Sequence, residues 1–522
     1  MKRRKAATLL VPSLAALAIV ALTLYAYRDL PAHAFAADDY QWLLGVRGLS
    51  FGELLRRAFD PAAQTHFYRP LIWLLFWLQT RAFGLDPRGF HAVSLALHLL
   101  NAALLGALLY RLQIAYCKLH IEEAQYAICN LQFAIPLLTM AIVALHPAPF
   151  EAVVWISAQS ELLASALLLL ALHFWLKPRP ADAEMQRQAA GRRRRICWSP
   201  HLLASTLTLG LALLAKESAV IGLPLLILLG RGPRVRRQAS HITPRASIFN
   251  AQCSMLNFVL PTLLTLGYIA LQIMIERRNY LLQQGGYGLG MQVVLNPLRS
   301  LALLVAPLPG TEHADAAWLV SVGAVIAIVL LLALAAGLWL RFRRPQSAIC
   351  YLQSAIILGL ALTLLPTAPF ASPPDSRYLY LPVMAGALLV GFWILDLGLM
   401  IGARSQIVKR QSKIINWLLV LALAYWATGE LHARAGRFAA ASGPGGSLWQ
   451  LATWACDAAR PERIVIVEPP VAAPHVAAIV ELACGPDVRA KIVGREQVAG
   501  AIKDRTLVIA FPNGSAEVQR WP

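Results

Sequence analysis

The stretch LALLAKESAVIGLPLLILLG, Leu211–Gly230, decides the fold, because it is apolar enough to lie in a membrane yet carries Lys216 and Glu217 near its middle. Basic sequence flanks it, at Arg192–Arg195 and Arg231–Arg237. Positively charged loops stay on the cytoplasmic side of a membrane, so the chain must cross an even number of times between these clusters. A helical hairpin with the two charges at its tip meets this requirement. The tip also avoids a cost of about 2.5–3.5 kcal/mol per ionised residue at the bilayer centre. We therefore expect Lys216 and Glu217 to face the outside. The alternative is that the two charges lie at the end of a helix and extend their charged groups to the membrane surface.

The whole chain has the composition of a membrane protein. Of its 522 residues 58% are hydrophobic, and the mean hydropathy is +0.57, far above the range of soluble domains. The 47 Lys and Arg against 27 Asp and Glu give a net charge of +20, which in a soluble protein would suggest nucleic acid. Here the basic residues cluster between apolar runs and lack the interleaved aromatic residues of a strand-binding groove. They therefore indicate topology, and we expect no nucleic-acid partner.

Apolar runs of about 20 residues, enough to cross roughly 30 Å of hydrocarbon, recur along the chain. They lie at 8–28, 91–111, 127–145, 154–176, 318–340, 349–366, 380–402 and 414–430, with shorter candidates at 201–215, 218–230 and 256–275. Basic clusters at 1–5, 177–195, 231–237, 341–344 and 404–413 all fall on one side if every run is a span. We therefore expect an all-α polytopic membrane protein with about 11 transmembrane helices, a cytoplasmic N-terminus and an extracytoplasmic C-terminus. In a bacterium this membrane would be the inner one. The first run also resembles a signal peptide ending at AHA (32–34), but its length favours a retained anchor.

This topology places four groups of polar residues on the outer side of the membrane. They are Asp38, Asp39, Tyr68 and Arg69 in the first outer loop (31–90), His146 and Glu151 in HPAPFEAVVW, Lys216 and Glu217 in the hairpin, and Arg377 and Tyr378 in PPDSRYLYLP. Taken singly, each has an ordinary interpretation as an Asx turn, a loop corner or an interfacial aromatic belt. Four groups at one boundary favour an active site, because ionisable residues at membrane depth are costly and usually functional.

The set suits transfer from a lipid-anchored phosphate donor. A carboxylate, Asp38 or Asp39, would orient and deprotonate an acceptor hydroxyl. Three cations, Arg69, Lys216 and Arg377, would hold the departing phosphate. The remaining outer-face residues are further members of the site: Tyr68, His146, Glu151, Glu217 and Tyr378. The spacing leaves open a divalent cation on Asp38, Asp39, His146 and Glu151, because it matches no diagnostic metal motif.

Six segments carry a family resemblance. DDYQWL, YRPLIWLLFWL, FHAVSLALHLLNAALL, HPAPFEAVVWISAQSELLAS, LLAKESAVIGLPLL and SRYLYLPVM, in this order over about residues 35–390, resemble the transmembrane core of the tetratricopeptide-containing O-mannosyltransferases and their bacterial relatives. The resemblance implies the GT-C glycosyltransferase fold, a catalytic acid in the first outer loop, a polyprenyl-phosphate-linked sugar (a hexose such as mannose) as donor, and inversion at the anomeric carbon. It matches Asp38 to the family's first acid and Asp39 to the neighbouring acid. The later motif positions match His146, Glu151, Lys216, Glu217 and Arg377.

The C-terminal part departs from that family. No 34-residue repeat follows the last span, so a protein acceptor is less secure than a glycan or lipid acceptor. We expect a core at 1–430, a Gly-rich linker at 431–447, and a small extracytoplasmic α/β domain at 448–522 with strands at 463–468, 488–494 and 506–511 and helices at 474–483 and 495–503. This domain either helps to place the acceptor or only caps the core. Cys456 and Cys484 lie in it, and spacing alone does not decide whether they are bridged. The Gly-rich outer segment 276–317 is a candidate lid.

Two other functions compete with a glycosyltransferase. A flippase or transporter of lipid-linked sugars also needs charges in the membrane, but it should place them near the midplane and show repeated halves. The charges here cluster at one boundary, and no repeat is visible. A catalytically silent assembly factor would keep the fold without chemistry, and the intact Asp38–Asp39 pair argues against it.

Overall fold

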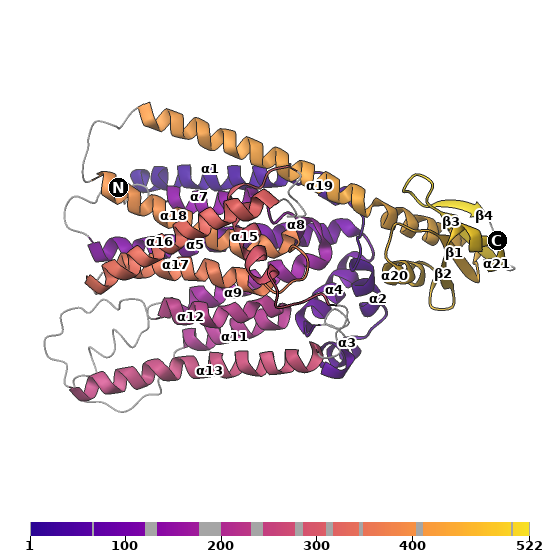
Figure 1. The fold of residues 1–522 in the computed structure, drawn as a ribbon, viewed down its shortest axis with the longest axis horizontal. Coiled ribbons are helices and arrows are strands. Elements are labelled where there is room, and N and C mark those ends of the chain that lie inside the picture. The colour runs from indigo at the N-terminus through magenta and orange to yellow at the C-terminus, as the bar shows by residue number, and fades with distance from the viewer. Residues whose placement is uncertain are drawn as a thin grey trace.

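The computed structural model describes residues 2–64, 67–120, 133–176, 200–230, 244–276, 285–309, 317–343, 348–402, 411–502 and 505–520. These segments form an elongated molecule, in which a bundle of long helices carries a small sheet-containing unit at one end (Figure 1). The basic clusters expected at 177–195, 231–237 and 404–410 lie outside the described residues.

The bundle consists of twelve helices in the described part of the chain, and all of them except α15 lie at predicted spans. They are α1 (Lys2–Ala26), α5 (Pro87–His120), α7 (Ala134–Leu145), α9 (Gln159–Trp175), α11 (Pro200–Ala215), α12 (Gly222–Gly230), α13 (Pro244–Glu276), α15 (Gln292–Val305), α16 (Ala317–Arg343), α17 (Ala348–Leu364), α18 (Tyr380–Gly402) and α19 (Gln411–Ala459). Within the described segments, six helices are long and apolar enough to cross a membrane, and further apolar helices are shorter. The chain is therefore a helical integral membrane protein, as predicted. The orientation of its termini stays a prediction.

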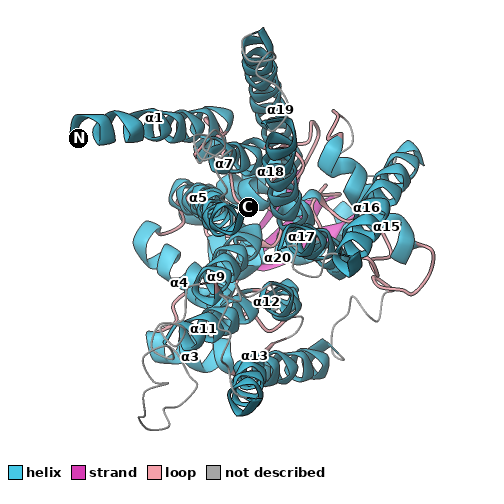
Figure 2. Cartoon of the chain, turned by 90° about the vertical axis from the view of Figure 1, so that its left-hand side faces the viewer, coloured by secondary structure: helices cyan, strands magenta, loops and turns pink. Residues whose placement is uncertain are grey.

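The hairpin predicted around the two charges is confirmed. Helix α11 ends at Ala215, Lys216 is extended, and a 3₁₀ turn over Glu217–Ile221 leads into α12. A Cβ added to Gly222 would lie 2.5 Å from Cδ1 of Leu209, so the start of α12 packs directly against α11 and the chain has reversed. Seen along the bundle, α9, α11 and α12 are neighbours (Figure 2).

The first outer loop folds into three short helices at one end of the bundle. They are α2 (Asp39–Val46), α3 (Phe51–Phe59) and α4 (Pro70–Phe83). Ser50 and Glu53 form a reciprocal capping box that starts α3, and Pro70 occupies the first turn of α4, where its missing N–H costs nothing. Their apolar side chains join one buried cluster that also contains residues of the C-terminal unit, including Leu448, Ile464 and Ile479. The loop and the C-terminal unit therefore share a core.

The C-terminal sheet agrees with the predicted α/β pattern. The strands β1 (Arg463–Val467), β2 (Arg489–Val493) and β3 (Thr506–Ala510) are parallel, α20 (Ala473–Cys484) connects the first two, and the order is β2-β1-β3-β4. An antiparallel edge strand, β4 (Glu517–Arg520), was not predicted. The second predicted helix is short, with a 3₁₀ turn at Arg495–Gln497 followed by α21 (Val498–Ala501).

The predicted linker at 431–447 is wrong as local structure, because these residues are helical and belong to the 49-residue α19. This helix runs from the bundle to the sheet unit without a break (Figure 1). A Cβ on Gly446 would lie 2.7 Å from Cβ of Ala34. The glycine thus permits a close approach between α19 and the first outer loop.

The segment 276–317, expected to be a loop, contains helix α15. Asn296 and Ser300 of this helix are buried, and α15 packs against α16. Residues 277–284 and 310–316, which flank α15, lie outside the described part of the chain. The structure therefore corrects the prediction of a loop only where α15 lies.

Candidate functional site

The adjacent acids Asp38 and Asp39 stand in opposite environments. Asp39 is 1% exposed. Its Oδ2 accepts from the backbone N–H of Ala36 at 2.8 Å, and its Oδ1 accepts from the backbone N–H of Ser157 at 2.7 Å and from the Ser157 hydroxyl. Burial raises the pKa of Asp39 to about 7, against the opposing effect of these hydrogen bonds. This carboxyl ties the first outer loop to the segment that precedes α9.

Asp38 is half-exposed, with 50% of its side chain accessible. Its Oδ1 accepts from Nε2 of His475 at 3.0 Å, while Oδ2 has no hydrogen-bond partner among the described residues. Partial burial acts to raise the pKa of Asp38, but His475, Arg377 and Arg69 more than offset it, so this pKa lies below its ordinary value. An ionised carboxylate with one unoccupied oxygen is the state that a general base requires.

Arg69 forms a two-pronged ion pair with Glu217. Nε donates to Oε2 at 2.8 Å and Nη2 donates to Oε1 at 2.6 Å, with side chains 14% and 26% exposed. The guanidinium also lies 4.3 Å from the ring centroid of Phe67. The hairpin tip and the start of α4 are thereby joined, in a geometry that sets the plane of the guanidinium.

Lys216 is buried, contrary to the prediction that the hairpin tip keeps its charge exposed. Its Nζ lies 2.5 Å from Oε1 of Glu161, and both side chains are 3% exposed. The prediction that the hairpin tip avoids the desolvation cost of a buried charge was wrong. A carboxylate on the neighbouring helix α9 compensates the buried ammonium instead. Glu161 was not among the predicted site residues, although an acidic residue inside a predicted span is a signal that could have identified it.

Arg377 lies between two carboxylates and two aromatic rings. Its Nη2 is 2.7 Å from Oδ2 of Asp375, and its Nη1 is 3.9 Å from Oε2 of Glu151. The guanidinium carbon is 4.5 Å from the ring centroid of Trp155 and 4.8 Å from that of Tyr378. Burial, followed by the charge of Asp375, raises the pKa of Glu151 above its ordinary value despite Arg377.

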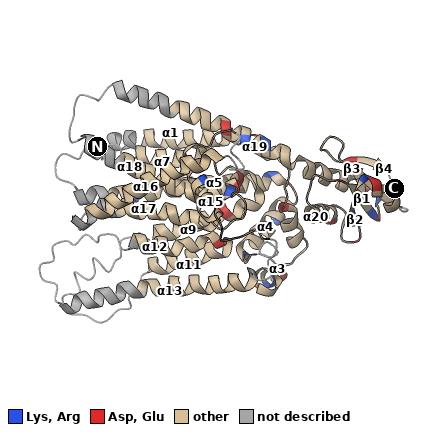
Figure 3. Ribbon diagram, in the orientation of Figure 1, with Lys and Arg blue, Asp and Glu red and all other residues tan. Residues whose placement is uncertain are grey.

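The ring of Tyr378 connects two of these ion pairs. The Nζ of Lys216 lies 4.9 Å from its centroid, while Arg377 packs on the same ring. The structure therefore brings together seven predicted residues: Asp38, Arg69, Glu151, Lys216, Glu217, Arg377 and Tyr378. Asp38 belongs to this group through its electrostatic interaction with Arg69 and Arg377. In the described part of the bundle, charged residues are sparse and their positions gather towards the end that carries the C-terminal unit (Figure 3).

Two predicted residues hold loops and do not contact this cluster. The Tyr68 hydroxyl donates to the carbonyl of Phe59 at 3.1 Å. The ring of His146 donates from Nε2 to the carbonyl of Leu304 at 3.0 Å and accepts at Nδ1 from the N–H of Ala148 at 3.2 Å. Burial lowers the pKa of His146 to about 4, so the ring is neutral.

No three His, Cys, Asp or Glu side chains in the described part of the chain lie close enough together to hold a metal ion. The four residues considered for a divalent cation, Asp38, Asp39, His146 and Glu151, therefore do not form a metal-binding group in this structure.

Comparison with solved structures gives several distant structural likenesses, including the following one. No protein-family model matches the chain, and no curated protein matches it. A crystal structure of ArnT from Cupriavidus metallidurans bound to undecaprenyl phosphate matches 95% of this chain and 93% of its own, with a TM-score of 0.45 and 12% sequence identity. A likeness this distant supports no inference about the site. The GT-C fold and the resemblance to the tetratricopeptide-containing O-mannosyltransferases therefore rest on the sequence segments.

Proposed function

We propose that the protein is an integral-membrane glycosyltransferase that moves a sugar from a polyprenyl-phosphate donor to an acceptor hydroxyl on a glycan, a lipid or a protein. The donor sugar is a hexose such as mannose, the reaction inverts the anomeric carbon, and it takes place on the extracytoplasmic face. Asp38 is the general base, and Asp39 holds the loop that carries it.

The observation that carries this proposal is the position of Asp38. It is a half-exposed carboxylate with one free oxygen, and both Arg69 and Arg377 act on its charge. The base must lie near the phosphate-binding cations, because the attacking hydroxyl and the leaving phosphate lie on opposite sides of one anomeric carbon. A polyprenyl tail stays in the bilayer, so a site at the end of the helices suits its phosphate.

The proposed step balances as a direct displacement. The acceptor oxygen forms a bond to the anomeric carbon as its proton passes to Oδ2 of Asp38. The bond between that carbon and the phosphate oxygen breaks, and polyprenyl phosphate leaves with the electron pair. Arg69 and Arg377 stabilise the growing negative charge, which fixed guanidinium groups do without reorganisation.

The carboxylates paired with these arginines have a positioning role. Glu217 and Asp375 hold Arg69 and Arg377 in place, at exposures of 14% and 20% for the two arginines. Lys216, at 3% exposure, lies too deep to meet solvent. We propose that Lys216 contributes positive charge to the donor-phosphate site across the ring of Tyr378.

The test is transfer of labelled hexose from polyprenyl-phosphate hexose donors, in proteoliposomes that contain the wild-type protein, Asp38→Asn or Asp39→Asn. We expect Asp38→Asn to reduce transfer by about 100-fold or more while donor binding and protein level persist. Asp86→Asn is the matched control, because Asp86 is an exposed carboxylate in the same outer loop. Donor binding or translocation without transfer, unchanged in Asp38→Asn, would instead identify a flippase or a catalytically silent relative.

A further inference from the structure

We propose that the C-terminal unit completes the site: His475 positions the carboxylate of Asp38 by donating its Nε2–H to Oδ1, which leaves Oδ2 for the acceptor hydroxyl. This inference rests on the proposed function of Asp38 as the base. It gives the unit a role in the reaction that a stabilising cap would not have.

The contact itself is direct and non-local. Nε2 of His475 lies 3.0 Å from Oδ1 of Asp38, although 437 positions separate the two residues. The imidazole is 20% exposed and the carboxylate 50% exposed. An ionised carboxylate can only accept hydrogen bonds, so the proton of this contact resides on Nε2.

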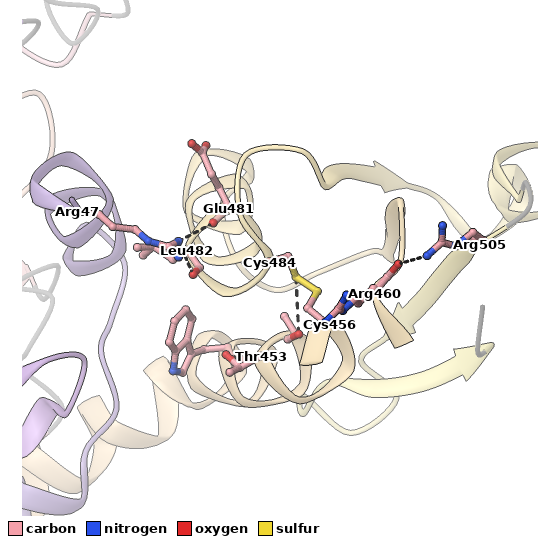
Figure 4. Close-up of a disulfide and its surroundings, with 10 residues drawn as sticks. Arg47, Thr453, Cys456, Arg460, Glu481, Leu482, Cys484 and Arg505 are labelled. Atoms are coloured by element: carbon pink, nitrogen blue, oxygen red, sulfur yellow. Dashed lines mark hydrogen bonds between the residues drawn. A yellow bond between two sulfur atoms is a disulfide. The ribbon is translucent and has the colours of Figure 1, made fainter. Parts of the chain in front are cut away.

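Helix α20, which carries His475 in its first turn, is attached to the site at both of its ends. At its C-terminal end, Nη1 of Arg47 donates to the carbonyls of Glu481 at 3.1 Å and Leu482 at 2.7 Å. The Cys456–Cys484 disulfide, which spacing had left open, joins α20 to the end of α19 (Figure 4). These attachments restrict the movement of His475 relative to Asp38.

A shared apolar core supports the same arrangement. Tyr40, two residues after Asp38, is 1% exposed and packs on the ring of Trp449 at a centroid distance of 6.1 Å. Ile479, near the middle of α20, is buried in the same cluster. The docking surface between the first outer loop and α20 is therefore apolar at its centre and polar at both ends.

The other groups around Asp38 cannot orient it in the same way. Arg69 at the start of α4 and Arg377 before α18 act on its charge without a hydrogen bond, and Asp39 beside it adds a like charge when ionised. Among the described residues, His475 is the one side chain that donates a hydrogen bond to Asp38. Without that donor the carboxylate is free to rotate about its χ2 bond.

The test compares His475→Ala, which removes the donor, with His475→Gln, whose side-chain amide can place an N–H near the former Nε2. We expect His475→Ala to lower kcat about 10- to 100-fold with little change in the KM for donor, and to move the acid limb of the pH profile upwards. His475→Gln should restore most of kcat and return the acid limb towards the wild-type position. Glu481→Gln is the control, because Glu481 is an exposed side chain on the same helix α20, so its acid limb should stay in place.

Three results would overturn the proposal. They are an unchanged kcat and acid limb in His475→Ala, a loss in His475→Gln as large as in His475→Ala, and an equal shift of the limb in Glu481→Gln. Protease resistance of the C-terminal unit and the state of its disulfide would show that each variant is folded.

A spectroscopic readout separates this inference from the proposed function. In protein with labelled histidine, the NMR signal of the His475 ring nitrogen Nε2, assigned from the signal lost in His475→Gln, should shift in Asp38→Asn because its hydrogen bond to Oδ1 is changed. That change supports the contact even if wild-type protein transfers no sugar, which would refute the glycosyltransferase alone. An identical His475 Nε2 signal in wild type and Asp38→Asn would refute the contact.

Discussion

The buried pair of Lys216 and Glu161 should make a strongly non-additive contribution to stability. The two charged atoms lie 2.5 Å apart with both side chains 3% exposed, so their attraction is about 7 kcal/mol at an effective dielectric constant of 20. Desolvation costs several kcal/mol per ion and cancels most of this gain. Removing one partner keeps the desolvation cost of the other and loses the attraction.

We therefore expect Lys216→Met and Glu161→Leu each to lower the free energy of unfolding by about 3–5 kcal/mol, because each leaves an uncompensated buried charge. The double variant should lose far less than the sum of the two. The assay is reversible unfolding of the purified protein in mixed detergent micelles, arranged as a double-mutant cycle.

An exposed ion pair supplies the control for this cycle. Arg505 and Glu462 lie 2.9 Å apart but are 56% and 66% exposed, so the coupling energy of Arg505→Met and Glu462→Leu should stay below about 1 kcal/mol. If the Lys216 and Glu161 substitutions also prove additive, with losses below about 1 kcal/mol each, the pair is not buried as described and the reasoning fails.

Three further predictions concern charge, pH and the disulfide. Arg377→Gln should raise the pKa of Asp38, so transfer should be lost at a higher pH on the acid side, and the KM for donor should rise; an unmoved acid limb would contradict this. Because the folded state raises the pKa of Asp39 to about 7, its protonated form stabilises the fold at low pH, and this stability should decline as pH rises from about 4 to about 7. Asp39→Asn should abolish that decline, measured as the wild-type minus variant unfolding free energy at each pH. Cys456 and Cys484 are 28 positions apart, so replacing both by Ser should destabilise the C-terminal unit by about 3–4 kcal/mol on loop entropy, seen as faster proteolysis; unchanged proteolysis would show that the bridge constrains nothing.

The positions of the membrane helices could be predicted because their signal is local. Each run of apolar residues is visible in the sequence, and basic clusters on both sides of Leu211–Gly230 required an even number of crossings. The environment of Lys216 was not predictable in the same way. Its partner Glu161 lies on another helix, and nothing local to the hairpin shows whether a charge is exposed or paired.

Glycine-rich composition is ambiguous for a related reason. ASGPGGS (441–447) has the residues of a flexible linker, yet the structure has it inside α19. Gly446 lies there against Ala34, where a Cβ would clash. A glycine required for close packing and a glycine that loosens the backbone look the same until the neighbouring chain is known.

The Asp38–Asp39 pair shows the same limit at the site itself. Successive residues at a helix start point about 100° apart, so Asp39 turns to Ser157 and the core while Asp38 turns to solvent and His475. The motif marks the right place but cannot rank its two acids, because the ranking depends on partners 118 and 437 positions away. Kinetics separates them: a base affects kcat at constant stability, whereas a buried anchor affects stability first. If Asp39→Asn abolished transfer at full stability while Asp38→Asn retained it, Asp39 would be the base, and the carboxylate with one free oxygen would not be the one that acts.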